Sequence, residues 1–171
     1  MNKNSLKNIA TEVINLEIDA LKTLKKSINK NFDRAVNTIV NCQSKIILCG
    51  VGKSGLIAAK IASTLSSVGS PAFSLSANDC LHGDLGSITK KDILILISNS
   101  GKSEEIIPII KFANRNKIKL IGIVSKKNSF LYKGSDIKIL LPQVKESGLG
   151  VVPTSSTSIQ LAIGDALAVA A

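Results

Sequence analysis

The sequence has few aromatic residues, one histidine and three cysteines, and each shortage excludes a class of protein. Aromatic residues make up 3% of the 171 residues and Trp is missing, so the core must consist of Ile, Leu, Val and Ala. Few aromatic side chains are available to stack on nucleic-acid bases, and the lysines are spread along the chain instead of forming a basic cluster. We therefore expect no nucleic-acid partner despite a net charge of +10. The charge suits an anionic small substrate, or reflects a Lys-rich composition.

The cysteines and the histidine predict no metal site and no cofactor. Cys42, Cys49 and Cys80 are odd in number and not at metal-ligand spacing, which favours reduced thiols in a cytoplasmic protein. No apolar run reaches the roughly 18 residues of a membrane span. Residues 1–13 lack the apolar region of a signal peptide, so we expect neither a membrane location nor export.

The first quarter of the chain has the periodicity of amphipathic helices. Apolar residues recur at steps of three and four over 5–29, and a second helix is predicted over 31–42. The apolar positions of the first helix are Ile9, Val13, Leu16, Ala20, Leu24 and Ile28. This stripe fits either the cover of the chain's own core or an oligomer face.

Short apolar strands then alternate with helices. Continuous apolar strands of this kind are buried on both faces, which predicts an α/β three-layer sandwich around a five-stranded parallel sheet. The predicted strands are 45–49, 72–76, 92–97, 119–124 and 137–141. The predicted helices are 54–68, 103–116, 128–134 and one that begins near Thr154. We expect one domain over 1–171, with a helical part at 1–42 and the sheet-containing core at 43–171.

The final helical pattern continues to Ala171 without a C-cap glycine or a basic last turn. This favours a cut over a natural terminus.

The loop after the first predicted strand is rich in glycine. Gly50, Gly52 and Gly55 match the G-x-G-x-x-G dinucleotide fingerprint, but the second strand ends at Ser76 without the acidic residue that a nicotinamide site needs. A P-loop would need glycine where the chain has Ile47. We therefore expect no nucleotide. Lys53 in this loop could neutralise a phosphate or polarise a carbonyl, or be one exposed lysine among many.

Two further loops are rich in hydroxyl groups at predicted helix starts. Ser98, Ser100 and Ser103 precede a helix whose free N–H groups and dipole suit a phosphate, and Ser103 would be its N-cap. Glu105 lies close to the same pocket. The hydroxyls of residues 154–157 open the last helix, where they either bind phosphate or simply cap it. His82 stands among small and acidic residues, and spacing alone favours a structural or exposed residue over a catalytic one.

Together these loops resemble the sugar isomerase (SIS) domain, and more narrowly the D-arabinose 5-phosphate isomerases of the KpsF/GutQ type. The matching motifs are Gly50-Val-Gly-Lys-Ser-Gly55, His82-Gly-Asp-Leu-Gly86, Ser98-Asn-Ser-Gly101, Pro153-Thr-Ser-Ser-Thr157 and Gly164-Asp-Ala-Leu-Ala168. The resemblance implies a flavodoxin-like homotetramer. It would interconvert D-ribulose 5-phosphate and D-arabinose 5-phosphate through an enediol, for 3-deoxy-D-manno-octulosonate and lipopolysaccharide synthesis.

The resemblance also assigns roles to residues. Lys53, Glu105 and Glu146 match residues implicated in catalysis, and His82 matches a substrate-contacting histidine. The residues expected to hold the substrate or its phosphate are Ser54, Gly69, Ser70, Ser98, Ser100, Ser103, Thr154, Ser155, Ser156 and Thr157.

The chain departs from the family pattern in three ways. The family continues with a segment that carries a further catalytic histidine, then two CBS modules. A histidine that binds inhibitory zinc in some members is replaced by Ser76, and the stretch between Glu146 and Pro153 is one residue shorter. Two rival functions stay open: a non-catalytic sugar-phosphate sensor, and an isomerase with another phosphosugar.

Overall fold

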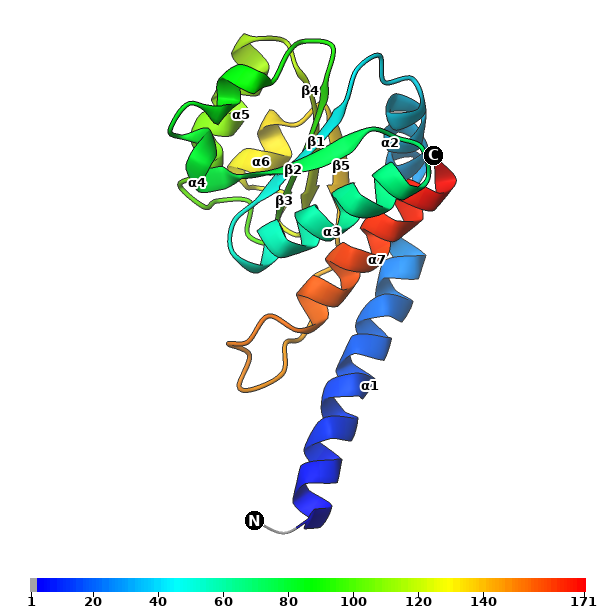
Figure 1. Ribbon diagram of the computed structural model, residues 1–171. Helices are drawn as coiled ribbons and strands as arrows, with labels where there is room; N and C mark the ends of the chain where they lie inside the picture. Colours follow the sequence, from blue (N-terminus) through cyan, green and yellow to red (C-terminus); the bar gives the residue numbers. More distant parts are fainter. Residues whose placement is uncertain (1–2) are drawn as a thin grey trace.

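The structure is a computed structural model that describes residues 3–171, and it contains one five-stranded, all-parallel sheet (Figure 1). The strand order is β2-β1-β3-β4-β5. The strands are β1 (Ile46–Gly50), β2 (Ala72–Ser76), β3 (Ile93–Ser98), β4 (Lys119–Val124) and β5 (Ile137–Leu140). The predicted α/β fold and all five predicted strands are confirmed, with ends that differ by at most one residue.

Helices cover both faces of this sheet, as predicted. They are α1 (Lys3–Ser27), α2 (Lys30–Val40), α3 (Lys53–Ser67), α4 (Ala77–Cys80), η1 (Asp84–Ser87), α5 (Ile106–Arg115), α6 (Phe130–Gly134) and α7 (Ser155–Ala170). The short elements α4 and η1 lie in a segment for which the sequence predicted a loop.

Two apolar clusters make up the core, one on each side of the sheet. Successive side chains of a strand point to opposite faces, so Ile95 of β3 joins one cluster while Leu94 and Leu96 join the other. The first cluster includes buried residues of α1, α2, α3 and α7, and the second those of α4, α5 and α6. This is the three-layer sandwich that the continuous apolar strands predicted.

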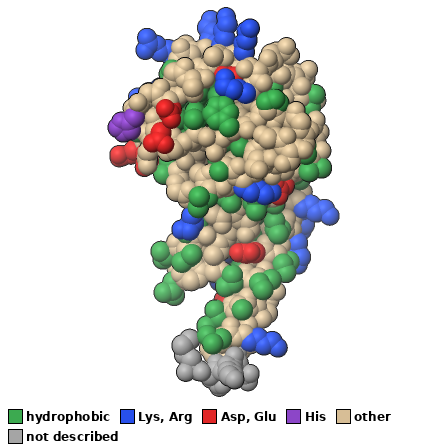
Figure 2. Space-filling view, in the orientation of Figure 1, with side chains coloured by type: hydrophobic (Ala, Val, Ile, Leu, Met, Phe, Trp, Pro, Cys, Tyr) green, Lys and Arg blue, Asp and Glu red, His purple; other side chains and the backbone are tan. Residues whose placement is uncertain are grey.

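Helix α1 joins the core only through its C-terminal part. Ala20 and Leu24 are buried, whereas Leu6, Ile9 and Ile14 are 50%, 52% and 57% exposed. The N-terminal part extends away from the body (Figure 1), and hydrophobic side chains are visible on it in Figure 2. A contiguous exposed apolar face usually marks an interaction surface. The apolar stripe of α1 therefore packs against the core at Ala20 and Leu24, and its exposed part is available to a partner.

No helix within residues 3–171 combines the length and the apolar character that crossing a bilayer requires.

Helix α5 begins later than predicted. The sequence indicated a start at Ser103, but the segment before Ile106 forms a turn in which the Ile106 amide donates to the Ser103 carbonyl. Pro108 gives the physical reason, because proline lacks the N–H that a helix interior uses. A helix that starts at Ile106 keeps Pro108 within the first turn, where N–H groups are free.

Candidate functional site

The loop from β1 to α3 lets the strand and the helix approach each other closely. A Cβ atom on Gly50 would lie 2.8 Å from the backbone of Ser54, and one on Gly55 would lie 2.8 Å from the Gly50 carbonyl. These glycines therefore have a packing role that needs no nucleotide. The turn places Lys53 and Ser54 in the first turn of α3, at the carboxyl edge of the sheet.

A cavity of about 370 Å³ lies beside this turn, where ligands of open parallel sheets bind. We call it the Lys53–Glu146 cavity. It brings together side chains from α3, from the loop after β3 and from the start of α7. Five residues with predicted site roles line it, namely Lys53, Ser54, Glu146, Ser156 and Thr157. Lys53 is exposed to the cavity, and its ammonium makes none of the ion pairs found within residues 3–171.

The carboxylate of Glu146 is bound at the N-terminus of α7. Its Oε2 accepts hydrogen bonds from the Thr154 amide at 2.9 Å, the Thr154 hydroxyl at 3.2 Å and the Ser156 amide at 3.2 Å. Free amides and the helix dipole favour an anion at this position. Glu146 therefore occupies the place where the hydroxyl cluster of residues 154–157 was predicted to hold phosphate.

These contacts set the charge state of Glu146. Burial would raise the pKa of its carboxyl, but hydrogen bonds from Ser156 and Thr154 outweigh burial and lower the pKa below its usual value. The side chain is therefore ionised at neutral pH. On its other side lies a second cavity of about 560 Å³, lined by α1 and residues 145–150, so that Glu146 stands between two openings.

The serine-rich segment after β3 is tied down by its own hydroxyls. The Ser98 hydroxyl accepts from the Gly101 amide at 3.0 Å, and that of Ser100 accepts from the Lys102 amide at 3.3 Å. Ser103 is not the N-cap of α5, because the helix begins three residues later. Only Asn99 of this segment lines the Lys53–Glu146 cavity, while Ser100 lines a different one.

Several predicted site residues lie outside the Lys53–Glu146 cavity. His82 is exposed between α4 and η1, and Glu105 occupies the N-cap position of α5 without a capping bond. Gly69 and Ser70 precede β2, where the Pro71 carbonyl accepts from the first amide of β1. They therefore lie at the amino edge of the sheet, opposite the cavity within one chain. Ser155 is fully buried in α7, and its hydroxyl finds no partner within residues 3–171.

No three His, Cys, Asp or Glu side chains gather into a potential metal site in the described part of the chain. Ser76, which stands where some family members have a zinc-binding histidine, caps α4 by accepting from the Asp79 amide at 3.4 Å.

Sequence reasoning missed two polar residues that line the cavity. Gln160 of α7 is 1% exposed, and its Oε1 accepts from the Ser54 hydroxyl at 3.1 Å, which joins α7 to α3. The sequence did contain a signal for Gln160, because it follows Ile159 on the apolar face of the predicted last helix. A polar side chain buried on such a face needs a hydrogen-bond partner, which makes it a candidate site residue. Asn99 lay within the predicted serine segment, but only its serines were chosen.

The fold and the cavity define an open, parallel α/β domain with a ligand-sized space at the carboxyl edge of its sheet. A comparison with known families identifies the domain more closely. The SIS domain model matches residues 39–170, so the chain belongs to the SIS domain family. It is 44% identical over 160 residues to a Yersinia pestis protein named arabinose 5-phosphate isomerase KdsD, and 43% identical over 167 residues to the Francisella tularensis protein of that name.

These matches span 93% and 95% of this chain but 49% and 51% of the two relatives, so the chain spans about half their length. Among solved structures, an Escherichia coli protein in complex with arabinose 5-phosphate superposes with a TM-score of 0.95 at 34% identity. That match covers 99% of this chain and 91% of the E. coli chain.

Proposed function

We propose that this chain is the isomerase domain of an arabinose 5-phosphate isomerase, which interconverts D-ribulose 5-phosphate and D-arabinose 5-phosphate. The observation that carries the proposal is the Lys53–Glu146 cavity, in which a cation without an ionic partner and an ionised carboxylate line the same small space. The names of the relatives and the ligand of the E. coli structure support the choice of substrate.

The reaction needs a proton carrier between C1 and C2 and an acid–base pair for the two oxygens. A base removes a C1 proton of the ketose while O2 takes up a proton, which gives the enediol. The enediol then takes a proton at C2 and gives up the proton on O1, which leaves the aldehyde at C1. Lys53 would stabilise the negative oxygen of the enediolate, a contribution of about 10²–10³ in rate for one well-placed donor. Glu146 is the carboxylate in reach of that space, whereas Glu105 and His82 stay predictions.

The substrate phosphate is proposed to bind at the serine segment 98–103. Its amides and hydroxyls supply neutral donors, while α7 already uses the Thr154 and Ser156 amides for Glu146. Because Ser98 and Ser100 each accept from a backbone amide, their hydroxyl protons are free to turn toward an anion. A cytoplasmic homotetramer that supplies 3-deoxy-D-manno-octulosonate for lipopolysaccharide synthesis is part of the same proposal.

A second candidate function is phosphosugar binding without turnover. It is favoured by the hydrogen bonds that hold Glu146, because a carboxylate with a lowered pKa is a weaker base. The position of Glu105 and His82 outside the cavity points the same way.

An isomerase assay separates the two candidates. The chain is incubated with ribulose 5-phosphate and formation of arabinose 5-phosphate is followed by NMR, beside calorimetric titration with both sugars. We expect conversion that falls about 10²–10³-fold in Lys53→Ala, with Lys111→Ala on the exposed face of α5 as the matched control. Binding without conversion would select the second candidate, and absence of both would reject the two together.

A further inference from the structure

A larger cavity lies on the other side of the serine segment. Its volume is about 700 Å³, and it opens between the carboxyl ends of β3, β4 and β5. The lining comes from three loops: Ser100 and Lys102 after β3, residues 125–128 after β4, and residues 140–143 at the end of β5. We call it the lysine cavity. Its size falls within the roughly 300–1,000 Å³ of small-molecule sites.

The polar wall of the lysine cavity carries one sign of charge. Lys102, Lys126 and Lys127 line it, and none of its lining residues is Asp or Glu. None of these lysines takes part in an ion pair in the described part of the chain. The Lys126 ammonium is instead held by the Gln143 side chain, whose Oε1 accepts its hydrogen bond at 2.6 Å. Three like charges in one concave site favour an anion.

A buried hydroxyl in the same wall lacks a partner. Ser125, the first residue after β4, is 5% exposed, and its Oγ makes no hydrogen bond within residues 3–171. Its backbone is fixed by a bond from its amide to the Asn99 carbonyl at 3.2 Å, so the side chain stays beside the cavity. Buried hydroxyls are normally paired, so the unpaired Ser125 hydroxyl behind this lining is available to donate to a ligand if its side chain turns toward the cavity.

Part of the remaining lining is apolar. Leu140, Leu141 and Pro142 line the cavity together with the lysines, so its lining has a charged side and a hydrophobic side. A small inorganic anion would leave the hydrophobic side uncovered. An organic phosphate, with a dianionic head and an uncharged body, matches both sides.

We propose that the lysine cavity is a second ligand site, separate from the Lys53–Glu146 cavity, that binds a phosphate monoester with an uncharged organic part. Its phosphate is held by Lys102, Lys126 and Lys127 with the Ser125 hydroxyl, and its body lies against residues 140–142. The proposal does not depend on the isomerase activity, because Ser125, Lys126 and Lys127 lie outside the segment 98–103 that is proposed for the substrate phosphate.

Phenyl phosphate tests this site directly. Titration into the full chain, followed by calorimetry and by amide chemical shifts, should give saturable binding with shifts at residues 125–128 and 140–143. The double variant Lys126→Ala with Lys127→Ala should weaken affinity at least about tenfold, since charge-assisted hydrogen bonds are the stronger class. The matched control is Lys25→Ala with Lys26→Ala, which removes the same charge from exposed positions at the end of α1.

The variant Ser125→Ala adds a readout that a merely structural serine would not give. Phenyl phosphate should bind more weakly, whereas the melting temperature of the free chain should not fall, because the removed hydroxyl has no partner there. No saturation, or equal losses in the two lysine pairs, would overturn the proposal. Shifts at Lys53, Asn99 and Glu146 in place of those at residues 140–143 would also overturn it, because phenyl phosphate would then bind in the Lys53–Glu146 cavity.

Discussion

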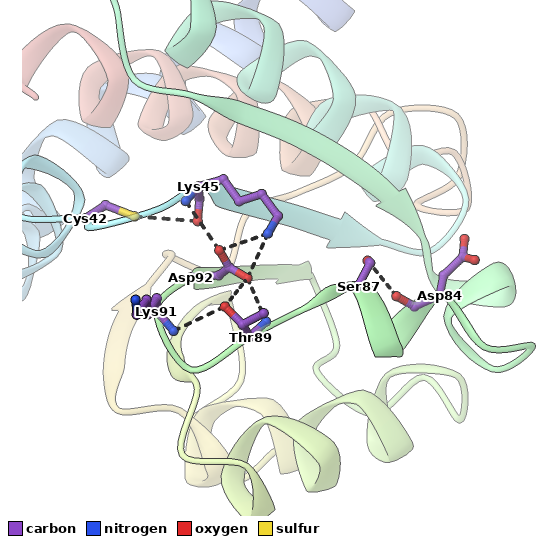
Figure 3. Close-up of polar contacts among 7 residues, drawn as sticks. All are labelled: Cys42, Lys45, Asp84, Ser87, Thr89, Lys91 and Asp92. Atoms are coloured by element: carbon purple, nitrogen blue, oxygen red, sulfur yellow. Dashed lines mark hydrogen bonds and ion pairs between the residues drawn. The ribbon is translucent and has the colours of Figure 1, made fainter.

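Two carboxylates at opposite edges of the sheet are both held by backbone amides, yet their surroundings differ. At the amino edge, Asp92 accepts from the Thr89 amide at 2.6 Å, the Thr89 hydroxyl at 3.0 Å and the Lys45 ammonium at 3.0 Å (Figure 3). Its side chain is fully buried, while that of Lys45 is 33% exposed. The charge is thus compensated by a cation in direct contact.

Glu146 at the carboxyl edge has amides and hydroxyls but no cation in contact. No ion pair involving it is found within residues 3–171, and Lys53 lines the same cavity without a hydrogen bond to it. It is also only partly buried, between two cavities. The comparison shows that a lowered pKa alone does not distinguish a candidate site carboxylate from a structural one. What sets Glu146 apart is a charge without a contacting cation beside open space.

The largest expected effect concerns Glu146. Glu146→Gln keeps an oxygen that accepts from the α7 amides but cannot take up a proton, so turnover should fall by about 10²–10⁴ if Glu146 acts as acid or base. The assay is conversion of ribulose 5-phosphate, with the melting temperature measured beside it. Glu104→Gln, at an exposed position on the same edge of the sheet, is the control. Equal turnover in both variants would remove Glu146 from the mechanism.

Asp92 should show the reverse pattern. Asp92→Asn removes the partner of Lys45 from a buried pair, which costs about 3 kcal/mol in the free energy of unfolding. For a chain of this size the melting temperature should then fall by about 6–12 °C. Turnover of the folded protein should stay unchanged. The surface variant Asp19→Asn, which breaks a pair with Lys22 whose side chains are 69% and 72% exposed, should change almost nothing.

Acid should weaken the amino edge in a defined pH window. Burial would raise the pKa of Asp92, but its bonds from Thr89, Ser44 and Lys45 outweigh burial and lower the pKa from 3.8 to about 2. A lowered folded-state pKa gives stability that is present above pH 3.8 and lost as the pH falls toward 2. The loss is about 2 kcal/mol. Denaturant unfolding between pH 5 and 2 checks this, and Asp92→Asn should lack that part of the pH dependence.

Most of the fold could be predicted from the sequence, because its signals are local. The strand at Ile93–Ser98 is a continuous apolar run, and such a run leaves few alternatives to a buried parallel strand. The predicted start of α5 was wrong, because Ser103 followed by two acidic residues has the sequence pattern of a helix start. Pro108, further along the chain, decides where the helix can begin.

The site was predictable in part. Lys53 could be placed because the glycines around it fix a strand–turn–helix unit. The hydrogen bonds of Glu146 could not be predicted, because they depend on the backbone path of residues 147–153. In this stretch Leu149 adopts a positive φ of 62°. A non-glycine residue rarely takes that conformation. The lysine cavity could not be predicted from the sequence either, because Lys102 and residues 125–128 come together only when strands β3 and β4 pair.

The smallest expected effect is at the ion pair between Lys60 of α3 and Asp165 of α7, which joins the two helices that begin at the Lys53–Glu146 cavity. Its side chains are 48% and 40% exposed, so water screens the attraction and the coupling free energy should be about 0–1 kcal/mol. A double-mutant cycle with Lys60→Ala and Asp165→Ala, measured by denaturant unfolding, gives this value. In 1 M salt, where the screening length is about 3 Å, it should approach zero. A coupling above about 2 kcal/mol would mean that surface charges hold α3 on α7, a task that we assign to the packing of Gly164 against Ile61.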